Sequence, residues 1–275
     1  MSDREIRLAL ISGGMYDPLY DRIPGFERGF GVTVQIGFRG THPELNAHLA
    51  AFDDPPYDLI STHTKYAPSQ KRFLAPLDRF NTAGFFPSVI GLATIGDALH
   101  GVPRNIDLRL LHYRTDLMGT APRSWEELVR TARELTRAPD LYGFAFTGME
   151  SGLFGTFFEL VESAGAALFP NTLVPQVDNE GGRWALSVLC DLYECGAVPP
   201  QIVDWQYDDV HQCFRSGGAA MVADWPGYYA SYTDQRSPVR TRFALARLPA
   251  GPAGRVCCNA GSHTFALTRN GAVKD

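Results

Sequence analysis

The sequence predicts an α/β protein in which helices cover largely parallel β-sheets, and three observations support this prediction. Strand and helix patterns alternate in the order β-α-β-α-β between Ile6 and Ser61, and this order requires parallel strands joined by crossover helices. Further amphipathic helices alternate with short apolar strands in the rest of the chain. The composition is that of a globular protein, with 45% hydrophobic and 20% charged residues.

The first part of the chain supplies three strands and two helices. Apolar and β-branched residues predict strands over residues 6–11, 32–38 and 59–61. Apolar residues near helical spacing between Leu19 and Phe26 predict one helix, which Gly29 and Gly31 end. A second helix begins at Pro43, because proline is tolerated in the first turn of a helix.

The later part of the chain begins with a different pattern. Residues 101–113 predict one long extended segment. Ser124 and Glu127 predict a capping box, in which the hydroxyl and the carboxylate each accept a hydrogen bond from an unpaired backbone N–H. Helices are then expected over residues 125–135, 154–164, 184–192 and 210–215, and strands over 142–147, 219–223, 243–248 and 264–267.

Bulk properties exclude several classes of protein. No stretch approaches the ~18 apolar residues of a membrane span, so no membrane insertion is expected. The net charge of −5 and the scattered basic residues argue against a nucleic-acid partner. Met1 to Glu5 lead directly into the first strand without a signal-peptide pattern, which leaves the compartment open. The five cysteines fit neither a disulfide framework nor a zinc pattern.

A search for catalytic motifs finds none, and we expect no catalytic residue and no cofactor. There is no Walker loop, and the segment from Gly148 to Gly152 has Glu150 where a nucleophile elbow needs serine. The seven histidines show no metal-ligand spacing, so no metal site is predicted. Three weaker interpretations remain: anion binding at residues 12–14, a glycosidase pair of Asp107 and Glu150, and ferric binding by residues 228–229.

Polar and aromatic residues follow several of the predicted strands, which is a stronger signal. In open α/β sheets, ligands bind beyond the carboxyl ends of the strands. Carbohydrate hydroxyls need charged partners that form paired hydrogen bonds, and the C–H faces of a sugar pack on aromatic rings. Such groups are supplied by Arg104, Asp107, Arg109, Glu150 and Trp225. The sequence therefore predicts a site for a small, hydroxyl-rich ligand.

Five segments together resemble a known family. They are residues 101–117, 122–128, 142–145, 219–225 and 261–266, in an order and spacing that cover nearly the whole chain. The sequence resembles the extracellular solute-binding proteins of family 1, which are the sugar-binding subunits of ABC importers.

The resemblance implies a fold and a division of the chain. The expected fold is the two-lobed periplasmic-binding-protein type II fold, with strand crossovers near residues 108–113 and 261–265. One lobe would contain residues 1–108 together with 262–275, and the second lobe residues 109–261. Family members continue past a point like Asp275 into helices that complete both lobes, so these C-terminal helices are expected to be missing here.

The resemblance also implies a function and a set of site residues. The chain would bind a carbohydrate or polyol in the cleft between its lobes, close on it, and deliver it to ABC transporter permease subunits outside the cytoplasm. A cytoplasmic small-molecule sensor and a hydrolase using Asp107 and Glu150 remain alternatives. The expected ligand-binding residues are Gly14, Tyr16, Asp17, Thr62, His63, Thr64, Lys65, Arg104, Asp107, Arg109, Glu150, Trp225, Gly227, Tyr228, Ser262 and His263.

Overall fold

The chain folds into two compact units, each with its own sheet. The computed structural model describes residues 4–13, 16–170 and 174–271. Unit 1 comprises Met1–Asp107 and Gly261–Asp275, and unit 2 comprises Leu108–Ala260. The chain therefore passes from unit 1 to unit 2 within β7 (Asp107–Leu108) and returns within β12 (Ala260–Gly261), two short strands that pair with each other.

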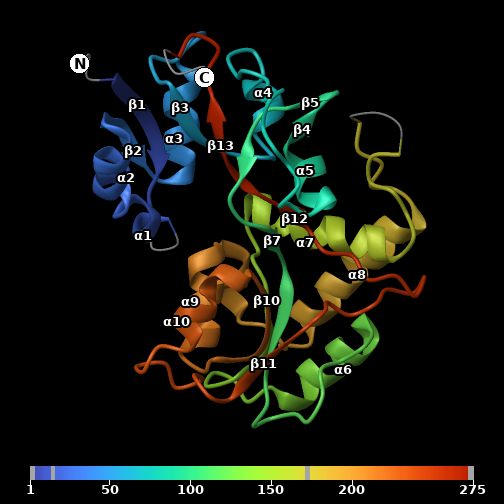
Figure 1. The fold of residues 1–275 in the computed structure, drawn as a ribbon. Helices are drawn as coiled ribbons and strands as arrows, with labels where there is room; N and C mark the ends of the chain where they lie inside the picture. Colours follow the sequence, from blue (N-terminus) through green and yellow to red (C-terminus); the bar gives the residue numbers. More distant parts are fainter. Residues whose placement is uncertain (1–3, 14–15, 171–173, 272–275) are drawn as a thin grey trace. The chain divides into compact units, whose positions relative to one another are not determined.

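Unit 1 is built on a five-stranded sheet of order β2-β1-β3-β13-β6, formed from both ends of the chain (Figure 1). The strands are β1 (Arg4–Ile11), β2 (Val32–Gly40), β3 (Leu59–His63), β6 (Val102–Pro103) and β13 (His263–Leu267). The first three strands are mutually parallel, as the alternating sequence pattern predicts. The late strand β13 is antiparallel to both β3 and β6.

The helices of unit 1 differ from the prediction in one respect. The single helix expected near residues 19–26 is two helices, α1 (Asp17–Tyr20) and α2 (Ile23–Phe30). Each has a proline in its first turn, Pro18 or Pro24, and a proline starts a helix readily but cannot continue one. Helix α3 (His42–Ala50) begins with a capping box that pairs Thr41 with Glu44.

The remaining elements of unit 1 are short and lie between β3 and β6. They are α4 (Ala67–Gln70), α5 (Pro87–Ala93), β4 (Thr94–Ile95) and β5 (Ala98–Leu99). The core of the unit lies where α3 packs on the sheet, since Leu45 and Leu49 are buried against Ile60 and Ala266. This core fixes the helix against the strands whose ends carry the candidate site.

Unit 2 is built on a four-stranded sheet of order β11-β8-β10-β9. Its strands are β8 (Leu110–Arg114), β9 (Tyr142–Ala145), β10 (Ala219–Asp224) and β11 (Phe243–Ala246). Strands β9 and β10 are parallel, and β8 is antiparallel to β10 and β11. The long extended segment expected over residues 101–113 is therefore three separate strands, β6, β7 and β8, which belong to three different sheets.

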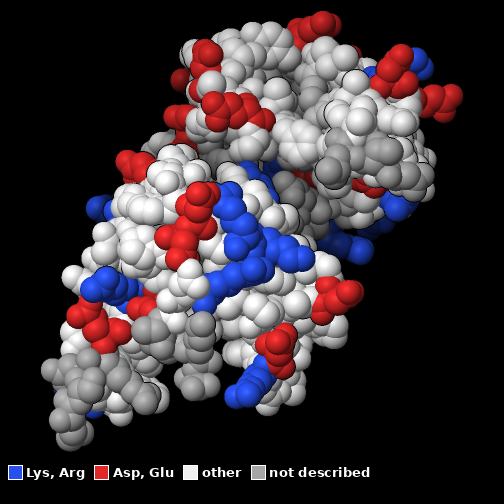
Figure 2. Space-filling view, turned by 90° about the horizontal axis from the view of Figure 1, so that it is seen from above, with Lys and Arg blue, Asp and Glu red and all other residues white. Residues whose placement is uncertain are grey.

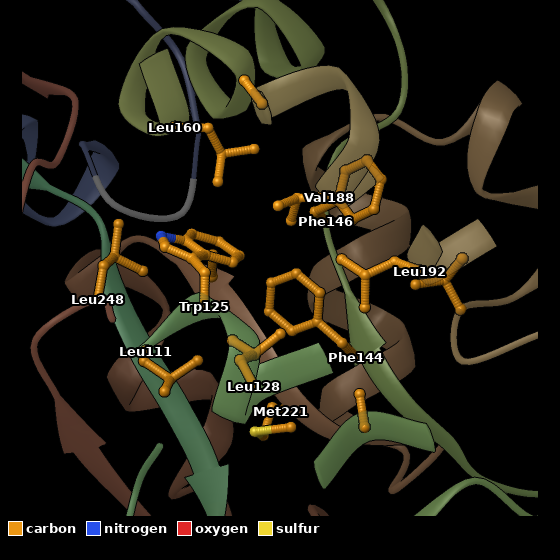
Figure 3. Close-up of a cluster of buried hydrophobic side chains, with 14 of the residues drawn as sticks. Leu111, Trp125, Leu128, Phe144, Phe146, Leu160, Val188, Leu192, Met221 and Leu248 are labelled. Carbon is orange, nitrogen blue, oxygen red and sulfur yellow. The ribbon is translucent and has the colours of Figure 1, made fainter. Parts of the chain in front are cut away.

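Four main helices cover the sheet of unit 2. They are α6 (Trp125–Leu135), α7 (Glu150–Ser163), α8 (Glu180–Glu194) and α9 (Tyr207–Arg215), with η1 (Pro200–Asp204), η2 (Pro226–Tyr228) and α10 (Tyr229–Tyr232) between them. The indole of Trp125 is 2% exposed and lies among Phe144, Leu128 and Leu160 (Figure 3). Burial of this one large cluster ties the helices to the sheet and stabilises the unit.

The predicted capping box at the start of α6 is only half formed. The hydroxyl of Ser124 accepts a hydrogen bond from the N–H of Glu127 at 3.1 Å, as predicted. The Glu127 carboxylate, however, accepts from the N–H of Arg123 at 2.8 Å. The prediction of a full capping box was wrong, because the Glu127 carboxylate accepts from the N–H of Arg123 and not from that of Ser124.

The surface carries charges of both signs. On the face shown in Figure 2, basic and acidic side chains are both present and adjoin one another in several places. No helix in the described ranges is long and apolar enough to cross a membrane.

Candidate functional site

The sheet topology of unit 1 brings five strand ends to one edge. Strands β1, β2 and β3 are parallel, so the residues that follow them emerge at the same edge. Because β13 is antiparallel to β3, its first residue lies at that edge, and β6 ends there because it is antiparallel to β13. We call the side chains that these ends supply the strand-end cluster: Tyr16, His42, His63, Arg104, Asp107 and His263.

Three imidazole rings lie together in the strand-end cluster. His63 and His263 are paired residues of β3 and β13, and their ring centroids are 4.7 Å apart. The ring of His42 lies 5.7 Å from that of His63 and 5.3 Å from that of His263. The Nε2 atom of His42 is buried and has no hydrogen-bond partner among the residues that the structure describes.

The Asp107 carboxylate is held beside His263 by Asn105. The side-chain amide of Asn105 donates to both carboxylate oxygens, at 2.9 and 3.0 Å. Its carbonyl oxygen accepts from the backbone N–H of His263 at 2.8 Å. One Asp107 oxygen then lies 3.5 Å from Nε2 of His263. A single amide side chain therefore fixes the carboxylate and the imidazole in one arrangement.

Arg104 lies between two aromatic rings and keeps part of its hydrogen-bonding capacity unused. Its guanidinium carbon is 4.7 Å from the ring centroids of both Tyr16 and Phe265. Its Nη1 donates to the hydroxyl of Tyr20 at 3.2 Å. Its Nε and Nη2 atoms are buried without a hydrogen-bond partner within the described part of the chain. These N–H groups are available to an acceptor on a ligand.

Burial sets the protonation states in the strand-end cluster. Desolvation, with a smaller contribution from the positive charge of Lys65, lowers the pKa of His42 and of His63 to about 4. The pKa of His263 also lies far below its ordinary value, chiefly because of burial. All three rings are therefore neutral at physiological pH. Burial raises the pKa of Asp107, whereas the hydrogen bonds from Asn105 and the charge of Arg104 oppose that shift.

Tyr16 contacts His263 within the strand-end cluster. Its hydroxyl forms a hydrogen bond of 2.8 Å with Nε2 of His263, and the two rings meet edge to face. Burial raises the pKa of Tyr16, so the hydroxyl stays protonated and remains a hydrogen-bond donor. Gly14, which was predicted beside it, lies outside the described residues.

The other predicted residues of unit 1 mostly have partners within the protein. The hydroxyl of Thr62 is buried against Gln70, and Thr64 accepts from the backbone N–H of Ser262 at 3.1 Å. Ser262 itself donates to the carbonyl of Asn105 at 2.6 Å. The carboxylate of Asp17 forms an ion pair with Arg39, and the ammonium group of Lys65 lies over the ring of Tyr66. The polar groups of these residues are therefore mostly used in contacts within the protein.

Unit 2 places its predicted residues at the corresponding edge of its own sheet. Trp225 follows β10, and Glu150 stands a few residues beyond β9, which is parallel to β10. Trp225 is half-buried, and Glu150 is exposed and accepts a hydrogen bond from Gln206 at 3.4 Å. Glu150 has a positive φ of 44°, which is uncommon for a residue other than glycine.

The tyrosines that follow Trp225 are engaged in contacts with neighbouring side chains. The ring of Tyr228 stacks on His211 with centroids 4.0 Å apart, and its hydroxyl donates to Asp208 at 2.9 Å. Tyr229 packs against Phe243 at 5.6 Å. Gly227 is exposed in η2. The ferric interpretation of residues 228–229 gains no support from these contacts.

Arg109 has an internal partner that the sequence did not reveal. Its guanidinium lies 3.1 Å from the carboxylate of Glu159, and both side chains are almost fully buried. It also donates to the hydroxyl of Thr156 at 2.9 Å. Glu159 in turn accepts from the backbone N–H of Asn259 at 2.7 Å. The side chain of Arg109 therefore stabilises unit 2 and has little capacity left for a ligand.

Sequence reasoning missed His42 and Asn105. His42 belongs to no motif, and Asn105 lies within the family-like segment 101–117 without being singled out there; both reach the cluster through the order of strands in the sheet. His42 directly follows a strand end, at the start of α3, so the strand-end rule that selected residues 62–65 would also have selected it. The only signal for Asn105 was its place between the predicted site residues Arg104 and Asp107, because its role depends on contacts with Asp107 and His263 in different strands.

The comparisons agree with this architecture. A family model described as bacterial extracellular solute-binding protein matches residues 24–275. A maltose-bound protein of T. maritima is similar, with a TM-score of 0.86 and 24% identity over 96% of this chain and 72% of that chain. A solute-binding protein of Agrobacterium radiobacter in complex with ribitol has a TM-score of 0.84 and 19% identity, covering 97% of this chain and 71% of that chain.

These matches establish the fold, which is that of the two-lobed periplasmic sugar-binding proteins. A curated relative, a probable ABC transporter-binding protein of Deinococcus radiodurans, is 27% identical over 195 residues. The match covers 66% of this chain and 46% of the relative, so this chain spans about half of that protein. Because the family model matches most of the chain, the protein belongs to the family of bacterial extracellular solute-binding proteins.

Proposed function

We propose that this protein is the substrate-binding component of an ABC importer and that it binds a carbohydrate or polyol. The family and the relatives support this proposal, since the similar structures are described with maltose and ribitol, and a further one from Agrobacterium vitis with D-mannitol. The protein acts by binding rather than by catalysis, and its partners are the permease subunits of the transporter. It works outside the cytoplasm, as the family description implies.

The chemistry of the strand-end cluster fits a ligand rich in hydroxyl groups. A sugar hydroxyl both donates and accepts, so it is best held between an acceptor and a donor. Asp107 is a buried carboxylate that accepts, and Arg104 is a half-buried residue whose Nε and Nη2 atoms are buried and can donate. The rings of Tyr16 and the histidines supply apolar surface for the C–H groups of a sugar.

The observation that carries the proposal is the pair of unused donors on Arg104. A buried polar group without a partner is costly, so native proteins rarely keep one unless something else binds it. The Nε and Nη2 atoms of Arg104 are such groups, and they lie in the same cluster as Asp107. A bound hydroxyl-rich ligand would satisfy both.

A panel of ligands tests the proposal. The full chain is heated with maltose, ribitol, D-mannitol and other neutral sugars and polyols, and the rise in Tm identifies the ligand that binds. We expect at least one member of the panel to raise the Tm in a concentration-dependent manner. If the purified protein instead shows no shift with any of them, and mass spectrometry finds no co-purified carbohydrate, the proposal is wrong.

Whether the ligand is recovered intact distinguishes a binding protein from a hydrolase. After long incubation with the protein, the ligand is recovered and analysed by mass spectrometry. We expect it to return unchanged, because binding proteins break no bond. Products that disappear in the Glu150→Gln variant would instead support a carbohydrate hydrolase that uses Asp107 and Glu150.

The cellular location of the protein is tested separately. Native cells are separated into periplasmic or extracellular and cytoplasmic fractions, and the protein is detected with an antibody. We expect it outside the cytoplasm. A purely cytoplasmic protein that still binds a carbohydrate would favour the small-molecule sensor.

A further inference from the structure

The strand-end cluster contains a set of side chains typical of a transition-metal site. His63, Asp107 and His263 each offer one ligand atom, and these three atoms lie within 4.8 Å of one another. It is the one group of three or more His, Cys, Asp or Glu side chains within metal-binding distance among the described residues. All three belong to unit 1, so the group does not depend on unit 2.

We propose that His63, Asp107 and His263 bind a divalent transition-metal ion, for which Zn²⁺ is the first candidate. Two imidazoles and one carboxylate suit zinc, and a tetrahedral site with bonds of about 2.1 Å places its ligand atoms about 3.4 Å apart. The distance of 3.5 Å between Nε2 of His263 and Oδ2 of Asp107 already matches that spacing. The ligand atom of His63 lies within 4.8 Å of the other two, so metal binding requires it to move closer to them.

A fourth ligand is within reach of the ion. The Nε2 atom of His42 is buried and lacks a hydrogen-bond partner in the described ranges, and its ring adjoins those of His63 and His263. If His42 rotates to bind, the site closes with three histidines and one aspartate. If it does not, the fourth position stays open to water or to a hydroxyl of a bound molecule.

Groups behind the ligands hold them in place, as expected of a metal site. Asn105 donates to both oxygens of Asp107 and accepts from the backbone of His263. This fixes the carboxylate beside the imidazole before any ion arrives. Such outer groups contribute about 10- to 100-fold to metal affinity in proteins.

Three features of the cluster oppose metal binding and limit its strength. The guanidinium of Arg104 lies close enough to lower the pKa of Asp107, so it also repels a cation there. Nε2 of His263 must leave its hydrogen bond with Tyr16. The Nδ1 atom of His63 accepts from the N–H of Lys65 at 3.0 Å, so coordination through Nε2 requires the ring proton to move to Nδ1. We therefore expect micromolar rather than picomolar affinity.

The test is a titration of the full chain with Zn²⁺ in the absence of any carbohydrate. The protein is freed of metal with a chelator and carries no affinity tag, and binding is followed by calorimetry. We expect one ion per chain with a Kd of about 10 µM or tighter. Co²⁺ should give visible absorption of the intensity typical of four-coordinate cobalt. Absence of saturable binding at one ion per chain overturns the proposal.

Variants locate the ion. His63→Gln, His263→Gln and Asp107→Asn should each weaken binding at least tenfold, with the Tm of the metal-free protein as a check on folding. Arg104→Met should tighten binding severalfold, because it removes the repelling charge. This opposite effect keeps the test decisive even if a histidine variant folds poorly.

Two controls exclude other sites. His48 lies in unit 1, where its ring stacks on Phe38 and bonds to Tyr57, so His48→Gln should leave metal binding unchanged. Cys257 and Cys258 are adjacent free thiols of unit 2, so the double variant Cys257→Ser, Cys258→Ser should also bind normally. If binding is lost in the cysteine variant and kept in His63→Gln, the proposed site is wrong. Because no sugar is present, the result is independent of the carbohydrate proposal.

Discussion

His63 and His263 face each other across β3 and β13, although they come from nearly opposite ends of the chain. The two residues are neighbours because the late strand β13 joins the first sheet antiparallel to β3. That reversal places the beginning of β13 beside the end of β3. The site of unit 1 is therefore assembled by strand order, not by any local motif.

The buried ion pair of unit 2 gives the first prediction. Arg109→Met leaves the carboxylate of Glu159 buried without its counter-charge, and this should lower the free energy of unfolding by about 3–5 kcal/mol. The double variant Arg109→Met, Glu159→Met should lose much less than the sum of the two single variants, since no charge is then left buried. Urea denaturation followed by tryptophan fluorescence measures all four proteins, and additive losses would show that the pair is not coupled.

Trp125 gives a second prediction, for the core of unit 2. Trp125→Ala should reduce the free energy of unfolding by about 3–5 kcal/mol, because it removes a large side chain that is 2% exposed. Leu186 on α8 is 57% exposed and provides the matched control. Leu186→Ala should change stability by less than about 0.5 kcal/mol. Similar losses in the two variants would mean that the cluster around Trp125 is not the main core.

His112 gives a prediction about pH. Its side chain is fully buried among Phe214, Tyr232 and Phe243, and burial lowers its pKa below 6.5. The unfolded chain therefore binds a proton at His112 more readily than the folded chain does. Its contribution should reduce stability as the pH falls below the unfolded pKa of 6.5, by up to about 1.4 kcal/mol per pH unit.

The variant His112→Gln isolates this contribution from those of other histidines. We expect its unfolding free energy to fall less steeply than that of the wild type when the pH is lowered from neutral to about 5. Urea denaturation at several pH values gives both slopes. Identical slopes would mean that His112 is protonated as easily in the folded protein as in the unfolded chain.

Much of the fold could be predicted from the sequence, because its signals are local. The strands β1, β2 and β3 are marked by apolar and β-branched runs, and the helix α3 by its proline and its cap. The segment over residues 101–113 misled the prediction, since extended backbone looks the same whether it forms one strand or three. The break between strands depends on partners from the other end of the chain.

The candidate site was less predictable, for a related reason. The rule that ligands lie beyond strand ends selected His63, whereas Asp107 was chosen for its carboxylate and His263 was expected from the family resemblance. It could not reveal that Arg109 forms an ion pair with Glu159, because that pairing joins a residue between β7 and β8 to the helix α7, 50 residues further along the chain. Nor could spacing reveal a metal site whose ligands come from three separate strands.

The affinity of the protein for its carbohydrate, measured in the wild type and in two variants, shows whether the strand-end cluster binds the ligand. With the ligand found by the panel, calorimetry should show that Asp107→Asn binds at least tenfold more weakly. Arg104→Met should also bind at least tenfold more weakly, because it removes the guanidinium whose Nε and Nη2 atoms have no hydrogen-bond partner within the described part of the chain. Tight binding that neither variant changes would contradict the account, because the ligand would then bind away from the strand ends.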